Sequence, residues 1–144
     1  MIVYRIIITI LIFTSFILSS CSTSKKGILN KGYHTLTTKY NVLFNGKEAF
    51  SVGEEILSNA YEDNFYEVLP VEPIYLRGEN IDETTIVPGF DQAEEKAVKA
   101  IQKHSIKINE LQYNRQIDEA YLLLGKARYF DRRFFPALEA FNFY

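Results

Sequence analysis

Small and large side chains recur at fixed spacings over residues 117–144, and this pattern constrains the fold more than any other feature. Gly125 and Ala137 are small, whereas Tyr121, Leu124 and Phe141 are large. Two helices approach closely only where the side chains at their crossing are small. The pattern therefore predicts an antiparallel pair of helices that cross at Gly125 and Ala137, with the large residues filling the groove around the crossing. The polar run 131–133 supplies the turn between them.

Residues 33–61 predict a second pair of helices. Apolar residues recur in steps of three and four, which is the helical period, at Tyr33, Leu36, Tyr40, Leu43 and Phe44. We interpret the stripe of Tyr and Phe side chains as core rather than as a glycan-binding platform. Asn45-Gly46 is a turn signal, and residues 47–61 again have a helical pattern. Two helices joined by so short a turn form an antiparallel hairpin.

The middle of the chain is less regular. Residues 62–90 hold all but one of the four prolines and show no helical period, so we expect an irregular excursion. A helix restarts at Asp91, where the spacing to Glu94 is that of a capping box, and ends between His104 and Leu111. The expected fold class is all-α, built from antiparallel helical hairpins with one irregular loop excursion.

The N-terminus predicts export and lipidation. Arg5 precedes an uncharged, mostly apolar run from Ile6 to Leu18, which is shorter than the about 20 residues of a membrane span. Leu18-Ser19-Ser20-Cys21 follows and resembles the lipobox of bacterial lipoprotein precursors. That resemblance implies a lipoprotein signal peptide over residues 1–20, lipidation at Cys21 with palmitate as an expected acyl chain, and a flexible tether over residues 21–32. The alternative is an ordinary signal peptide or signal anchor with an incidental cysteine.

The sequence offers little chemistry for catalysis. The chain has one cysteine, which excludes an internal disulfide and a cysteine-based zinc site. His34 and His104 have no ligand spacing and no evident nucleophile beside them. Neighbouring residues on a helix do not face each other, so we interpret the adjacent acidic pairs as solvated. These pairs are Glu54-Glu55, Glu94-Glu95 and Asp118-Glu119.

Charge and loops exclude further classes. The net charge of −2 gives no reason to expect nucleic acid. We interpret Arg132-Arg133 as a solvated turn, and no glycine-rich phosphate loop is present in the sequence. We therefore predict no enzyme activity, no cofactor, no metal and no small-molecule substrate.

The C-terminal pattern resembles a tetratricopeptide repeat. Tyr121, Leu124, Ala137 and Phe141 stand, relative to Gly125, where that repeat has its large aromatic, Leu, Ala and Phe. One departure is a charged residue at position 128, where an aromatic is usual. Residues 33–61 match the template less well, because a threonine at position 37 replaces the small glycine. This resemblance implies a degenerate repeat-like hairpin at 33–61, and a helix plus a truncated repeat at 91–144.

The lipobox, together with residues 32–50, 61–72, 96–106 and 118–144, resembles the start of a known family. These are the tetratricopeptide-repeat lipoproteins of the Bacteroidetes gliding-motility and type IX secretion machinery (SprE/PorW type). The resemblance implies a non-enzymatic scaffold or adaptor, anchored in the outer membrane, facing the periplasm and binding envelope proteins of that machinery. Members are several times longer, so we expect this chain to be an N-terminal fragment.

Two alternatives from other classes stay open. One is another tetratricopeptide-repeat lipoprotein adaptor, of the barrel-assembly type. The other is a glycan-binding lipoprotein of the SusD type, which also contains such repeats. A glycan binder is expected to display exposed, coplanar aromatic rings, whereas an adaptor is expected to present a concave helical groove.

Overall fold

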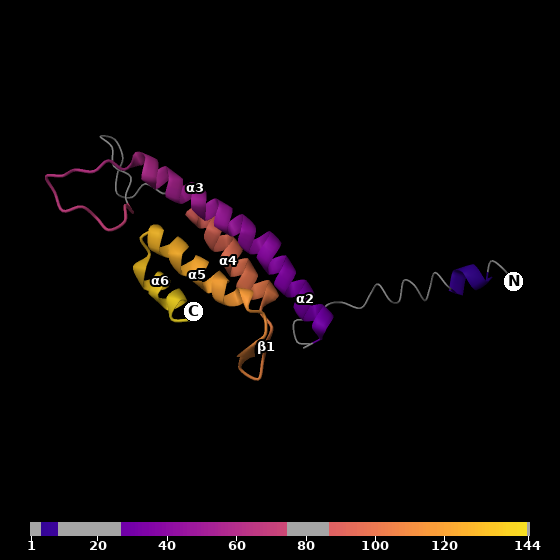
Figure 1. Ribbon diagram of the computed structural model, residues 1–144. Helices are drawn as coiled ribbons and strands as arrows, with labels where there is room; N and C mark the ends of the chain where they lie inside the picture. The colour runs from indigo at the N-terminus through magenta and orange to yellow at the C-terminus, as the bar shows by residue number, and fades with distance from the viewer. Residues whose placement is uncertain (1–3, 9–26, 75–86, 144) are drawn as a thin grey trace.

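The computed structural model describes residues 4–8, 27–74 and 87–143 (Figure 1). The described parts are mostly helical, which confirms the all-α class. No helix among these residues is long and apolar enough to cross a membrane. Beyond a helical stretch at residues 4–8, the elements are α2 (Ile28–Thr37), η1 (Thr38–Leu43), α3 (Phe44–Ala60), α4 (Phe90–His104), β1 (Lys107–Ile108), β2 (Leu111–Gln112), α5 (Gln116–Phe130) and α6 (Phe134–Phe141).

The predicted turn at Asn45-Gly46 is wrong. α2, η1 and α3 follow one another without a break and form one long rod (Figure 1). Gly46 lies inside this rod, where a Cβ would meet Leu123 Cδ2 at 2.9 Å and Lys96 Cβ at 3.0 Å. The glycine therefore allows α4 and α5 to approach the rod closely. The predicted tether also ends early, because helix α2 begins at Ile28; residues 21–26 lie outside the described residues.

The predicted inner face of the first helix is also wrong. Four of its five residues are exposed, namely Tyr33, Leu36, Tyr40 and Phe44. The buried residues of α2 and η1 include Asn30, His34 and Thr38, and those of α3 are Gly46, Phe50, Gly53 and Leu57. At about 100° per residue, a regular α-helix would point these two sets in directions more than 100° apart.

The π-helix η1 resolves this mismatch. A π-turn closes its hydrogen bond one residue later than an α-turn, so it adds a residue to the turn. The added residue brings the buried positions of α3 into line with those of α2. The rod therefore presents one continuous face to α4 although its sequence period is interrupted.

The core lies between helices that pack largely in chain order, α3 on α4, α4 on α5 and α5 on α6. α4 and α5 meet through small buried residues, namely Ala93, Ala97, Ala100, Ala120 and Ala127. At one end of this core the rings of Phe50, Phe90 and Phe130 pack against one another with centroid distances of 5.3–5.4 Å. Close packing of small residues and interlocked rings fixes the spacing of the three central helices.

The start of α4 differs from the predicted capping box. The residue before the helix is Gly89, with φ of 106°, and the helix has no side-chain cap hydrogen bond. Asp91 Oδ1 accepts a hydrogen bond from Gly89 N at 3.3 Å. A Cβ at Gly89 would lie 2.4 Å from the backbone oxygen of Ala49, so the position requires glycine for both conformation and space. Glu94 points elsewhere, toward α5.

A small β-hairpin that the sequence analysis did not predict joins α4 to α5. β1 and β2 pair antiparallel, with Lys107 opposite Gln112 and Ile108 opposite Leu111. The two turn residues, Asn109 and Glu110, both have positive φ. That conformation is typical of the two-residue hairpin turn that matches strand twist, and Asn109 is the residue that favours it.

Candidate functional site

A groove runs between α3 and α5, and we call it the α3–α5 groove. It consists of two adjoining hollows of about 450 and 320 Å³. The first is lined by Lys39, Tyr40, Leu43, Phe44, Lys47, Gln116 and Glu119, and the second by Lys47, Phe50, Glu54, Glu119, Leu122, Leu123 and Lys126. Lys47 and Glu119 line both hollows and form an ion pair of 3.0 Å across the groove.

The α3–α5 groove has an apolar floor and a charged rim. Its floor consists of Leu43, Phe50 and Leu123, which are buried. Tyr40 and Phe44 stand on its wall and expose 65% and 55% of their surfaces. Charges of both signs line the edges, so the groove does not have the uniformly basic surface that nucleic acid needs. Such an arrangement suits an amphipathic protein segment.

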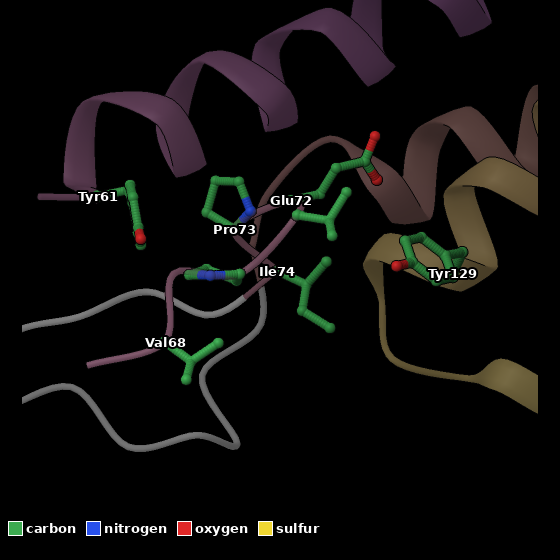
Figure 2. Close-up of a pocket in the computed structure, with 8 residues that line it drawn as sticks. Tyr61, Val68, Glu72, Pro73, Ile74 and Tyr129 are labelled. Atoms are coloured by element: carbon green, nitrogen blue, oxygen red, sulfur yellow. The ribbon is translucent and has the colours of Figure 1, made fainter. Parts of the chain in front are cut away.

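A separate hollow, outside the α3–α5 groove, lies under the irregular segment after α3 (Figure 2). It has a volume of about 360 Å³ and is lined by Tyr61, Val68, Pro70, Val71, Glu72, Pro73, Ile74 and Tyr129. Figure 2 shows Tyr61 and Tyr129 on opposite sides, with Pro73 and Ile74 between them. Val68 and Val71 are almost fully exposed, so the hollow is open on the loop side. Among the described residues that line it, the titratable groups are the carboxylate of Glu72 and the two tyrosines.

The structure brings His34 and His104 together, although the sequence analysis gave them no partner. Their Nδ1 atoms lie 3.0 Å apart and both residues are buried. One ring must donate and the other accept, since a neutral imidazole has one nitrogen of each kind. The signal that could have pointed to a buried polar row is the four-residue spacing of Asn30, His34 and Thr38 on one helix face.

Thr38 and Asn114 extend the histidine pair into a polar junction. Asn114 is fully buried and donates from Nδ2 to the His104 carbonyl at 2.9 Å and to Thr38 Oγ1 at 3.2 Å. Thr38 Oγ1 donates to the His34 carbonyl at 2.6 Å. Asn114 Oδ1 accepts from the backbone N–H of Gln116 at 3.1 Å, at the start of α5. The junction therefore ties the rod, α4 and α5 to one another.

The polar junction is a structural and pH-sensitive feature. Burial lowers the pKa of His104, and the nearby His34 and Lys99 lower it further. Within the described part of the chain, no group of three or more His, Cys, Asp or Glu side chains could hold a metal ion.

The residues of the predicted repeat meet where α5 packs on α6. A Cβ on Gly125 would lie 2.4 Å from the Phe141 ring, so the glycine makes room for that ring. Leu124 and Ala137 are buried, and Tyr121 stacks on Phe143 at 5.2 Å. Cys21, the predicted lipidation site, lies outside the described residues.

The interpretation of Glu94 as a solvated residue is wrong, because its side chain is 19% exposed and binds two arginines, whereas Arg133 is exposed in the turn as predicted. Arg133 binds both Glu94 and Asp131, the latter at 2.7 Å. Arg128, the departure from the repeat pattern, binds Glu94 at 2.8 Å and the Pro136 carbonyl at 3.1 Å. Although burial raises the pKa of Glu94, the hydrogen bonds from Arg133 and Arg128 outweigh it and lower that pKa. We call these residues the Glu94 network.

No protein-family model matches the chain, and no curated protein matches it either.

Proposed function

We propose that this chain is a lipid-anchored helical adaptor that binds a partner protein in the α3–α5 groove. The observation that carries the proposal is the apolar floor of this groove beside two exposed aromatic side chains, Tyr40 and Phe44. Fully burying a large apolar side chain is favourable by about 1.5–3 kcal/mol, so a partner that covers both rings gains a substantial binding free energy. Aromatic residues are also the side chains that most often dominate protein interfaces.

The expected occupant is an amphipathic helix or an extended segment of another protein. An amphipathic helix can insert apolar side chains three or four residues apart, one into each hollow on either side of the Lys47–Glu119 ion pair. The rim carries Lys39 and Lys126 as well as Glu54, so a partner with charges of both signs would pair with it. Rim charges of this kind select the orientation of a partner more than they add affinity.

The anchor and the wider role rest on the resemblances in the sequence. The lipobox ending at Cys21 supports lipidation, and Ser22 without an acidic run behind it supports the outer membrane, with the helices facing the periplasm. The stretches shared with the gliding and type IX secretion lipoproteins support a role in that machinery. In this proposal the adaptor couples export components of the outer membrane to periplasmic ones.

Groove variants in the native cell test the proposal. Replacing both Tyr40 and Phe44 by Glu should leave type IX cargo in the periplasm and stop surface spreading, while outer-membrane barrel proteins still assemble. Val52→Glu is the matched control, because Val52 is an exposed residue of α3 that does not line the groove. Export unaffected by the double variant would refute the groove as the binding site. Failed barrel assembly would favour the barrel-assembly adaptor, and loss of growth on one polysaccharide would favour the glycan binder.

A second experiment tests the anchor separately. Cys21→Ala should leave an uncleaved precursor that incorporates no labelled fatty acid. If the unaltered chain itself incorporates no label in cells, the lipid anchor is refuted, whereas the groove is not.

A further inference from the structure

Helix α2 has an unusual distribution of side chains. Its buried residues are polar, Asn30 and His34, whereas its large apolar residues face outward. Ile28 and Leu29 are about nine-tenths exposed, and Tyr33 and Leu36 are more than half exposed. We call these four residues the outer face of α2. A helix on the surface of a protein in water normally has the reverse arrangement.

The outer face of α2 lies on one side of the helix. Leu29, Tyr33 and Leu36 are separated by four and three residues, which places them in one stripe. In Figure 1, α2 forms the end of the rod nearest the N-terminus, away from α6. The other described helices that pack on the rod do so through its opposite, buried face.

The sequence before and along α2 is basic. From Cys21 to Lys47 the sequence contains no Asp or Glu, although the whole chain has a net charge of −2. The same segment contains Lys25, Lys26, Lys31, Lys39 and Lys47. In the described part of this segment, Lys39 reaches over the ring of Tyr40, with Nζ 5.1 Å from the centroid. Exposed apolar and aromatic side chains flanked by lysines are typical of helices that lie on an anionic membrane surface.

We propose that the outer face of α2 docks on a phospholipid surface that contains anionic headgroups. The proposal rests on the proposed lipid anchor at Cys21. The six residues from Ser22 to Gly27 can span at most about 20 Å, so an anchored Cys21 holds α2 beside the bilayer. Leu29, Tyr33 and Leu36 would enter the boundary between headgroups and acyl chains, and Lys39 would contact the anionic headgroups. The rod then lies along the membrane.

Site-specific labels on vesicles test this docking. In the full chain with Cys21→Ser, an environment-sensitive fluorophore is attached at Leu36→Cys, and in a second sample at Glu139→Cys, an exposed position on α6. Both samples are bound to vesicles of phosphatidylcholine with phosphatidylglycerol. We expect a blue shift and quenching by spin-labelled lipid at position 36 and neither change at position 139. Lys39→Glu should weaken the response at 36 by at least about fivefold.

Four outcomes decide between docking and its alternatives. A fluorophore at position 36 that stays in water on vesicles holding the chain overturns the proposal. If the fluorophore is shielded without vesicles when the chain is concentrated, a second copy of the chain covers this face and the proposal is overturned. If it is shielded only when a purified envelope protein is added, that protein covers the face and the proposal is again overturned. The unaltered chain can also fail to take up an acyl label in cells. If the fluorophore at position 36 is nevertheless shielded on vesicles, docking is upheld and only the lipid anchor is refuted.

Discussion

Replacing Gly53 by Ala should destabilise the fold, although alanine is the better helix former. Gly53 lies in the middle of α3, and a Cβ there would lie 2.6 Å from Phe90 Cε1 and 2.8 Å from Cζ. Carbon atoms in favourable contact are about 3.5–4.0 Å apart, so the new methyl group overlaps the ring by about 1 Å. Phe90 is 1% exposed and is held between Phe50 and Phe130, so its ring has no free space to move into.

The expected magnitude follows from two opposing terms. Overpacking a core costs about 1–3 kcal/mol, whereas alanine in place of glycine in a helix interior gains about 1 kcal/mol. We therefore expect a net loss of up to about 2 kcal/mol in the free energy of unfolding. Gly32→Ala is the matched control, since Gly32 lies in α2 with nothing within 4 Å of its added Cβ. Gly32→Ala should therefore gain only the roughly 1 kcal/mol of higher helix propensity.

Thermal unfolding of the full chain in a mild detergent, followed by far-ultraviolet circular dichroism, measures both effects. A change of 1 kcal/mol corresponds to roughly 4 °C in Tm for a domain of this size. Gly53→Ala should therefore lower Tm by several degrees, and Gly32→Ala should raise it by a smaller amount. Adding Phe90→Leu to Gly53→Ala should cost less than the sum of the single changes. Equal increases in Tm for both glycine variants would refute the packing of Phe90 against α3.

Three further predictions use the polar junction and the Glu94 network. Because the pKa of His104 is lowered, the unfolded chain binds more protons than the folded one below the ordinary value of 6.5. The free energy of unfolding should therefore fall as the pH decreases from about 6.5, by up to about 1.4 kcal/mol per pH unit for this proton. Tm measured against pH should show this fall, and His104→Phe should make it smaller. Asn114→Ala removes two donors and an acceptor from a fully buried site and should cost about 2–3 kcal/mol in chemical unfolding, with the exposed Asn45→Ala as control. Glu94→Gln should cost about 1–2 kcal/mol at neutral pH, and this difference from the unaltered chain should shrink as the pH falls below the ordinary carboxylate value of 4.5 toward the lowered pKa of Glu94.

The helices could be predicted from the sequence because their period is local. The all-α class and a helix from about Asp91 to His104 both followed from apolar spacing. Gly125 lies against the Phe141 ring and Ala137 is buried, but a crossing of the two helices at these residues stays a prediction. Such features depend on neighbours within a few turns, and a single sequence contains that information.

The errors share a different cause, which is packing between distant segments. Asn45-Gly46 has the composition of a turn, but Gly46 serves the approach of Leu123 and Lys96 from other helices. The histidine pair joins residues 70 positions apart, so a local sequence pattern could not predict that these two side chains meet. The inner face was misassigned because the buried residues of α2 are polar and His34 pairs with the distant His104, so the apolar pattern marks the exposed side of this helix.

The π-turn η1 makes the rod unequally tolerant of changes in length. Deleting one residue between Thr38 and Leu43 would convert η1 into regular α-helix, and the buried positions on either side would stay aligned. Inserting one residue, or deleting one within α3, would instead turn the flanking segments by about 100° relative to each other and expose half of the buried row. Relatives of this protein that are shorter by one residue are therefore expected to lose it in η1.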